Sequence, residues 1–366
     1  MTRLPRIDGL RAECYEVPTD APESDGTLQW SSTTCVVAYA RSGAMEGMGF
    51  TYSHAAAAAL VRGTLAEALI GADATAPEAS WTPMLRSVRN LGRQGIAAHA
   101  ISAVDVALWD LKARLADTSL AEAWGTVRET VPVYGSGGFT SYDERQLHEQ
   151  LSGWRRRGVQ WAKIKVGRHP ASDVQRVRVA REALGPGVEL FVDANGAYTP
   201  KQALAFAEAF ADLDVTWLEE PVSSDDLEGL RRVRFRAPAG MVVTAGEYGY
   251  HPIDLRKLLD AGAVDVLQAD VTRCLGFTGL HKVAAECESR GVPLSTHGAP
   301  ALSAHAGACL TPIVHVEHFH DHVRLEDRLF RGVPEVRDGA LCVNRGAPGH
   351  GLSLDTEAAS LFALDA

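Results

Sequence analysis

The chain has 366 residues, of which 46% are hydrophobic, and this predicts one large domain accompanied by a smaller one. The formal net charge is −10, and acidic and basic residues are spread along the whole length, so we expect no nucleic-acid partner. The first residues lack the apolar segment of a signal peptide and no apolar run is long enough to span a membrane, so we expect a cytoplasmic protein without membrane contact.

The N-terminal third alternates between strand-like and helix-like patterns. Strands are expected at 7–17, 33–39 and 43–50. Helices are expected at 54–70, 81–89 and 94–115. A polar, turn-rich segment at 18–26 predicts a loop between the first two strands, and Ser53 is suited to cap the first helix. Strands followed by helices indicate an α+β unit.

After residue 126, short apolar segments alternate with amphipathic helices about every 20 to 30 residues. The apolar segments lie at 131–134, 161–166, 189–192, 215–218, 241–244, 264–267, 292–295 and 313–316. Continuous apolar strands are typical of a parallel sheet covered by helices. The pattern therefore predicts an α/β fold built on an eightfold barrel, and the loop-rich residues 332–366 are expected to fold back on the first unit.

Ionisable or amide side chains follow or close most of these apolar segments. They are Lys163, Lys165, Asp193, Asn195, Glu219, Glu247, Asp270, His297 and Glu317. In such barrels the chemistry lies at the C-terminal ends of the strands. A packed barrel has no structural need for so many ionisable groups at one end, so the set predicts an active site.

Lys163 and Lys165 share one face of the same strand, because alternate side chains of a strand point the same way. Two ammonium groups on an apolar strand are costly to bury unless they have a role. The charge of Lys163 should disfavour protonation of Lys165, which would allow Lys165 to act as a base. The alternative is that both lysines pair with acids at the mouth of the barrel.

Asp193, Glu219 and Glu247 come from three successive strands. Three converging carboxylates repel one another unless a hard cation neutralises them, and oxygen ligands suit Mg²⁺. The alternative is that these acids pair with surface lysines. Glu220, next to Glu219, should point away by strand alternation and is not counted as a ligand.

These residues resemble the motifs of the mandelate racemase branch of the enolase superfamily, over essentially the whole chain. The resemblance rests on the segments 163–165, 192–196, 218–221 and 246–247, on Asp270, His297 and Glu317, and on the helical segment 104–110. It implies a capping α+β domain at 1–126, a modified TIM barrel of the (β/α)7β type at 127–331, and a segment at 332–366 that packs on the cap.

The resemblance also implies roles for individual residues. Mg²⁺ would be held by Asp193, Glu219 and Glu247. Lys165 would be one acid/base group, and His297, oriented by Asp270, would approach the substrate from the opposite side. Lys163 and Glu317 would contact the substrate carboxylate, with Glu317 donating a hydrogen bond if it is protonated. Asn195 is a candidate for holding a substrate hydroxyl or assisting Mg²⁺.

The expected chemistry is removal of the proton α to a carboxylate. The predicted reaction is dehydration of an acid sugar, an aldonate or aldarate, to a 2-keto-3-deoxy acid, because the candidate lid residues are polar. Those residues are Thr19, Asp20, Glu23, Ser24, Asp25, Tyr52, Ser53 and His54, with Tyr52 and His54 as candidate substrate contacts. The alternatives are a racemase or epimerase that transfers a proton between Lys165 and His297, and a barrel that binds an acid without converting it. The resemblance further implies a homo-oligomer, a dimer or an octamer, which light scattering would detect.

Two other features suggest different chemistry. Four histidines lie close together in the sequence: His315, His318, His320 and His322. A zinc hydrolase of similar fold would place a His-x-His motif after the first barrel strand, where this chain has Tyr134-Gly135, so we expect these histidines to be solvated or to line the rim near Glu317. The six cysteines have no CxxC spacing and are expected to be reduced and packed.

Overall fold

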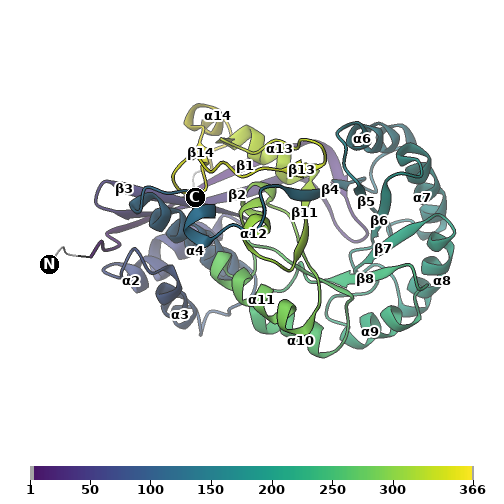
Figure 1. Cartoon of the computed structure of the whole chain (residues 1–366), viewed down its shortest axis with the longest axis horizontal. Helices are drawn as coiled ribbons and strands as arrows, with labels where there is room; N and C mark the ends of the chain where they lie inside the picture. Colours follow the sequence, from purple (N-terminus) through teal and green to yellow (C-terminus); the bar gives the residue numbers. More distant parts are fainter. Residues whose placement is uncertain (1–3, 365–366) are drawn as a thin grey trace.

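A computed structural model describes residues 4–364. An N-terminal α+β part lies beside a barrel of parallel strands surrounded by helices (Figure 1). The predicted N-terminal α+β unit and the predicted α/β barrel are therefore both confirmed. Within the described residues, no helix combines the length and the apolar character that crossing a lipid bilayer would need.

The N-terminal part is an antiparallel sheet packed against helices. The strands, in sheet order, are β1 (Gly9–Ser24), β2 (Gln29–Ser42) and β3 (Met45–Tyr52). The helical segments are α1 (Ala56–Leu60), the π-helix η1 (Val61–Leu65), α2 (Ala66–Leu69), α3 (Pro77–Ser87), α4 (Ile96–Leu115) and α5 (Leu120–Trp124). The helix α4 packs on β2 and β3 and is buried over most of its length, which explains why its sequence is so strongly apolar.

The predicted loop at 18–26 is wrong for most of its length. β1 continues to Ser24 and stays paired with β2, with an irregular register between Pro18 and Glu23. Glu23, Ser24 and Asp25 at the end of this segment are buried, because they meet side chains from other elements: Trp30 Nε1 donates to Glu23 Oε2 at 3.0 Å, and Ser24 Oγ lies 2.6 Å from Thr140 Oγ1. Tertiary contacts outweigh the turn signals here.

Close contact between β3 and α4 depends on glycine, and this gives a stability prediction. A Cβ added at Gly49 would lie 2.2 Å from the carbonyl oxygen of Ala103 in α4. We expect Gly49→Ala to lower the free energy of unfolding by about 1–3 kcal/mol, because the helix has to move away from the sheet. The measurement is the midpoint of urea unfolding. The matched control is Gly63→Ala in η1, where the added methyl group meets no atom within 4 Å and stability should be unchanged or slightly higher.

The barrel contains all eight predicted strands. They are β4 (Val131–Gly137), β5 (Trp161–Lys165), β6 (Glu189–Asp193), β7 (Val215–Glu219), β8 (Val242–Ala245), β9 (Val266–Ala269), β10 (Leu294–Thr296) and β11 (Ile313–Phe319). Each strand pairs in parallel with the next, and β11 pairs with β4 to close the barrel. The eight strand ends therefore meet around one mouth.

A helix follows each strand and covers the outside of the barrel (Figure 1). The helices are α6 (Glu144–Arg156), α7 (Pro170–Leu184), α8 (Pro200–Ala211), α9 (Leu227–Arg236), α10 (Pro252–Asp260), α11 (Gly276–Arg290), α12 (Pro300–Cys309) and α13 (His320–Leu329). Because the outer faces of the strands pack on these helices, the segments read as continuous apolar runs rather than as alternating ones.

The C-terminal segment contacts both parts of the molecule. It contains β12 (Phe330–Arg331), β13 (Ala340–Leu341), β14 (Ser353–Leu354) and α14 (Thr356–Ser360). The strand β13 pairs with the start of β4, whereas His350 N donates to Asp110 Oδ1 of α4 at 2.8 Å and Glu16 N donates to Phe362 O. The division of the chain at residues 126 and 331 stays a prediction.

The cysteines largely follow expectation. Cys14, Cys35, Cys274, Cys287 and Cys309 are buried, and no disulfide is present among residues 4–364. Cys342, directly after β13, is exposed.

Candidate active site

The strand ends bring the predicted residues together. β5, β6 and β7 are adjacent and in register, so Lys165 pairs with Asp193 and Asp193 pairs with Glu219. Glu247 follows β8 after Gly246, whose φ is +144° and whose added Cβ would lie 2.0 Å from the carbonyl oxygen of Gln268. Only glycine allows this turn beside the next strand, and the turn carries Glu247 into the mouth of the barrel.

Asp193, Glu219 and Glu247 form a buried group of carboxylates. One oxygen of each lies within 4.8 Å of the others, and all three side chains are almost fully excluded from solvent. The Oε2 atom of Glu247 is buried without a hydrogen bond, although His297 Nε2 lies 3.3 Å away. Burial and the charge of Asp193 raise the pKa of Glu219 to about 8. Three all-oxygen donors in a buried site fit a hard divalent cation such as Mg²⁺.

Glu220 is not part of this group of carboxylates, as predicted, but it lies close enough for their charges to act on it. Its φ of +36° breaks the strand alternation, and the side chain is almost completely buried. Burial, together with the charges of Glu247 and Asp193, raises the pKa of Glu220 well above its usual value. The alternation rule failed because the strand β7 ends at the residue before it.

The two lysines are held by the same carboxylates. Lys163 Nζ donates to Glu219 Oε1 at 2.5 Å and lies 2.9 Å from Glu317 Oε1, whereas Lys165 Nζ donates to Asp193 Oδ2 at 2.5 Å. Burial is the largest influence on Lys165 and acts to lower its pKa, as does the charge of Lys163, but the charges of Asp193, Glu247 and Glu219 together raise the pKa overall. Lys163 thus acts in the expected direction, but the nearby carboxylates outweigh it, and the lysines pair with acids.

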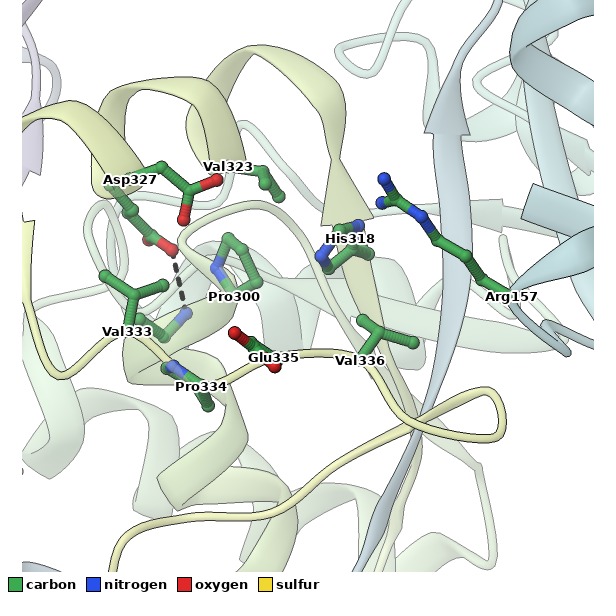
Figure 2. A pocket seen from close by; sticks show the side chains of 11 residues that line it. Arg157, Pro300, His318, Val323, Asp327, Val333, Pro334, Glu335 and Val336 are labelled. Atoms are coloured by element: carbon green, nitrogen blue, oxygen red, sulfur yellow. Dashed lines mark hydrogen bonds between the residues drawn. The ribbon is translucent and has the colours of Figure 1, made fainter. Parts of the chain in front are cut away.

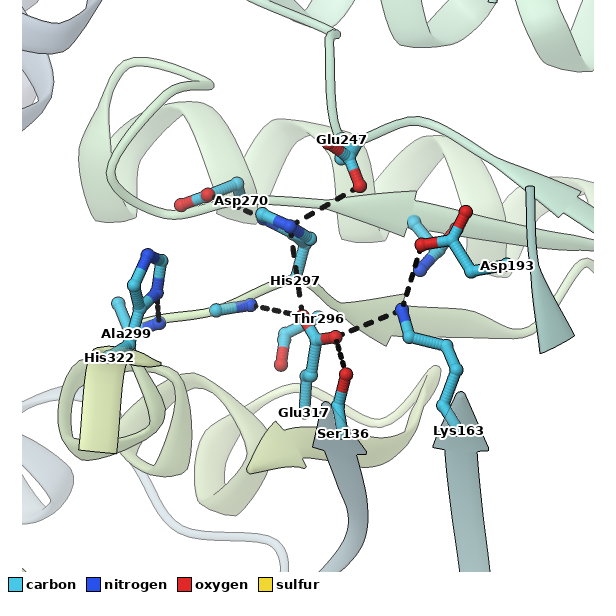
Figure 3. A network of polar contacts seen from close by, with 12 residues as sticks. Ser136, Lys163, Asp193, Glu247, Asp270, Thr296, His297, Ala299, Glu317 and His322 are labelled. Atoms are coloured by element: carbon cyan, nitrogen blue, oxygen red, sulfur yellow. Dashed lines mark hydrogen bonds and ion pairs between the residues drawn. The ribbon is translucent and has the colours of Figure 1, made fainter. Parts of the chain in front are cut away.

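His297 and Asp270 form a hydrogen-bonded pair (Figure 3). His297 Nδ1 lies 2.8 Å from Asp270 Oδ2, while the backbone N–H of Thr272 donates to Asp270 Oδ1 at 2.7 Å. Burial acts to lower the pKa of His297, but the carboxylates of Glu247 and Glu317 raise it overall. Because Asp270 accepts from Nδ1, the Nε2 atom of the imidazole faces Glu247 and is the atom available for proton transfer.

Glu317 lies between His297 and Lys163 (Figure 3). It accepts hydrogen bonds from Ser136 Oγ at 2.6 Å and from Gly298 N at 2.7 Å, and Lys163 Nζ lies 2.9 Å away. Burial acts to raise the pKa of Glu317, but the charge of Lys163 lowers it overall. Glu317 thus accepts hydrogen bonds here. The role of donor, which was expected only for a protonated Glu317, is not seen.

A cavity of about 420 Å³ opens above this group, within the size range of small-molecule sites. Its lining includes Lys165, Asn195, Glu247 and His297 from the barrel, as well as Tyr52 and His54, whereas Lys163 and Glu317 are not among the lining residues. Sequence reasoning missed several other lining residues: Leu28, Trp30, Ser32, Thr33, Thr34, Tyr248, Arg273, Phe319 and Asp321. Arg273 follows Asp270 and Asp321 follows Glu317, so the search for polar residues after each strand could have found these two.

A second cavity, of about 580 Å³, lies elsewhere. Its lining includes Arg157 after α6, His318 of β11, Asp327 of α13 and Glu335 of the C-terminal segment (Figure 2). None of the residues predicted for the active site lines it. The larger of the two cavities is therefore not the predicted active site.

The expectation that the four histidines are solvated or line the rim near Glu317 is wrong for His315, whereas His322 does line the active-site cavity. His315 is buried inside the barrel, where its Nδ1 lies 2.9 Å from Ser295 Oγ among aromatic rings. His322 is also buried; it stacks on Tyr52 and lines the active-site cavity. Burial lowers the pKa of each to about 4. In the described part of the chain they belong to no group suited to a metal.

Comparisons with known proteins agree with this geometry. Residues 22–125 match the mandelate racemase/muconate lactonizing enzyme N-terminal domain, and residues 146–359 match the enolase C-terminal domain-like family. The chain is 34% identical over 361 residues to the 3,6-anhydro-alpha-L-galactonate cycloisomerase of Streptomyces coelicolor, covering 96% of this chain and 98% of that protein. It is 28% identical to the L-talarate/galactarate dehydratase of Salmonella typhimurium, covering 96% and 90%.

Solved structures show the same fold. A mandelate racemase/muconate lactonizing enzyme-like protein from Rubrobacter xylanophilus is 51% identical, with a TM-score of 0.96 over 98% of this chain and 100% of that one. A racemase from Streptomyces coelicolor with bound magnesium is 33% identical, with a TM-score of 0.91 over 98% and 100%. The chain thus belongs to the mandelate racemase/muconate lactonizing enzyme subgroup of the enolase superfamily, and it is an enzyme of that superfamily with a carboxylate group suited to Mg²⁺.

Proposed function

We propose that this enzyme removes the proton α to the carboxylate of an acid sugar and then eliminates the β-hydroxyl group as water, giving a 2-keto-3-deoxy acid. The observation that carries the proposal is that Lys165 and the His297–Asp270 pair line one cavity and each contacts the carboxylate group that suits a metal. Asp193 is 2.5 Å from Lys165, and Glu247 is 3.3 Å from His297. Two proton carriers thus flank one binding place.

The difficulty of the reaction explains the need for these residues. An α-proton is weakly acidic, because its removal places negative charge on the neighbouring carboxylate. Mg²⁺, when held by Asp193, Glu219 and Glu247, supplies a Lewis acid for that charge. Lys163 Nζ, buried beneath the cavity, adds a fixed positive charge to the same region.

Two groups then move protons. One of Lys165 Nζ and His297 Nε2 accepts the α-proton, and the other donates a proton to the departing oxygen as the β C–O bond breaks. The enol that remains gains a proton at the β-carbon and becomes the 2-keto acid. Asp270 keeps the proton of His297 on Nδ1 and so leaves Nε2 free for exchange.

Opening of a ring is a second candidate, favoured by the 34% identity to a cycloisomerase of an anhydro sugar acid over 96% of the chain. If the β-oxygen belongs to an internal ether, the same two proton transfers break the C–O bond and release no water. The residues required are the same, so the two reactions differ only in the substrate that the cavity accepts.

A screen in D₂O with Mg²⁺ tests the proposal. Open-chain and anhydro acid sugars are incubated with the enzyme, loss of the α-proton is followed by NMR, and 2-keto acids are trapped with semicarbazide. A 2-keto acid from an open-chain acid supports dehydration, and one from an anhydro acid supports ring opening. Exchange with only an epimer as product would favour the racemase alternative, and no exchange with any acid that raises the melting temperature would leave only a binding protein.

A further inference from the structure

We infer that the substrate carries a single carboxylate and that its far end is neutral, so the enzyme selects aldonates or their anhydro forms over aldarates. This inference rests on the proposed function. It follows from how charge is distributed along the cavity, whose outer end we define by Trp30, Ser32, Thr33 and Asp321.

The lysine and arginine side chains that line the cavity, among residues 4–364, are Lys165 and Arg273, and both belong to the metal end. Lys165 is paired with Asp193. Arg273 Nη1 lies 3.3 Å from Glu247 Oε1, and its Nε lies 3.3 Å from Asp270 Oδ2. These cations serve the first carboxylate and the catalytic acids, and neither is free for a second carboxylate at the outer end.

The outer end is acidic. Asp321 Oδ2 accepts from Thr33 Oγ1 at 2.6 Å, and Asp321 Oδ1 accepts from Arg324. Arg324 also donates to the carbonyl oxygen of Pro18 and is not among the lining residues. Asp25 is a further aspartate that lines the cavity, and its Oδ1 accepts from the backbone N–H of Leu28 at 2.6 Å.

Glu23 is a second acidic residue close to Asp321. The side chain is 1% exposed and accepts from Trp30 Nε1, and burial together with the charge of Asp321 raises its pKa to about 8. The charge of Asp321 thus adds to burial in disfavouring a neighbouring carboxylate. A terminal hydroxyl could donate to Asp321 or to the lone pairs of Thr33 Oγ1 and accept from Ser32, whereas a terminal carboxylate would meet like charge.

The test compares matched pairs of acids that differ only at the last carbon: galactonate with galactarate, and gluconate with glucarate. We expect kcat/KM to favour the best mono-acid over its diacid by about 10²-fold, because the diacid is rejected by charge rather than by size. Equal turnover of both, or a preference for the diacid, would overturn the inference while leaving the proposed function intact. Failure of every acid, anhydro acids included, to exchange its α-proton would remove the proposed function and this inference with it.

Two variants probe the cause. Ser32→Lys places a cation at the half-buried outer end, and Asp321→Asn removes an anion there and frees Arg324. Each should raise the ratio of diacid to mono-acid kcat/KM by about 10-fold or more. The matched control is Ser31→Lys, the exposed neighbour on β2 that does not line the cavity, which should leave the ratio unchanged. A ratio that stays constant in both Ser32→Lys and Asp321→Asn would contradict the charge argument.

Discussion

Lys165→Ala and His297→Asn should each reduce formation of the 2-keto acid by about 10²–10⁴-fold or more, because each removes one of the two proton carriers. The two variants should differ in D₂O. The variant that lacks the group taking the α-proton should lose deuterium exchange as well as elimination. The variant that lacks the group protonating the departing oxygen should still exchange the α-proton while forming no product.

This difference in deuterium exchange identifies which of Lys165 and His297 is the base that takes the α-proton. The measurement is NMR of the α-position alongside trapping of the 2-keto acid. Lys201→Ala, at an exposed lysine on α8, is the matched control and should behave as the parent enzyme. Circular dichroism and thermal melting check that each variant is folded. Elimination within 10-fold of the parent rate in both Lys165→Ala and His297→Asn would contradict the assigned roles.

Removal of divalent cations should abolish turnover, and added Mg²⁺ should restore it. Mg²⁺ should also raise the melting temperature of the parent protein, since a ligand at about 100 times its Kd stabilises the folded state by about 2.7 kcal/mol. Glu219→Gln should lose both effects, because one of three charged oxygen donors becomes a neutral amide. Lys163 still retains Glu317 as a neighbour in this variant, so the fold should persist.

The melting experiment separates metal binding from catalysis. Glu208→Gln, an exposed glutamate on α8, serves as the control and should show the parent's response to Mg²⁺. Activity that survives exhaustive chelation would contradict the metal role. A Mg²⁺-dependent rise in melting temperature that persists in Glu219→Gln would contradict the assignment of that residue.

The barrel and the group at its mouth could be predicted because both depend on local patterns. An apolar strand followed by a helix recurs along the chain, and the residue that ends each strand lies at the mouth whatever the packing of the helices. Asp193, Glu219 and His297 were found in this way. The same logic failed at Glu220, because a single left-handed residue at the end of β7 changes which way the side chain points.

The pKa of Lys165 and the outer end of the cavity could not be predicted, because both depend on distances between remote segments. The acid in contact with Lys165, Asp193, is 28 residues away in the chain at 2.5 Å, and together with Glu247 and Glu219 it outweighs burial and the charge of Lys163. Thr33 and Asp321 are 288 residues apart and meet only in the folded molecule. The loop predicted at 18–26 was wrong for a related reason: the segment pairs with β2, and Ser24 is buried by contact with Thr140, 116 residues away in the chain.

The exposed Cys342 has a practical consequence. It follows β13, which pairs with Val131 and Pro132 at the amino end of β4, whereas the catalytic groups lie at the carboxyl ends of the strands. The other cysteines are buried, so a maleimide dye should attach at this one position. Fluorescence from such a label would follow association or tumbling of the molecule in solution while the substrate entrance stays unobstructed.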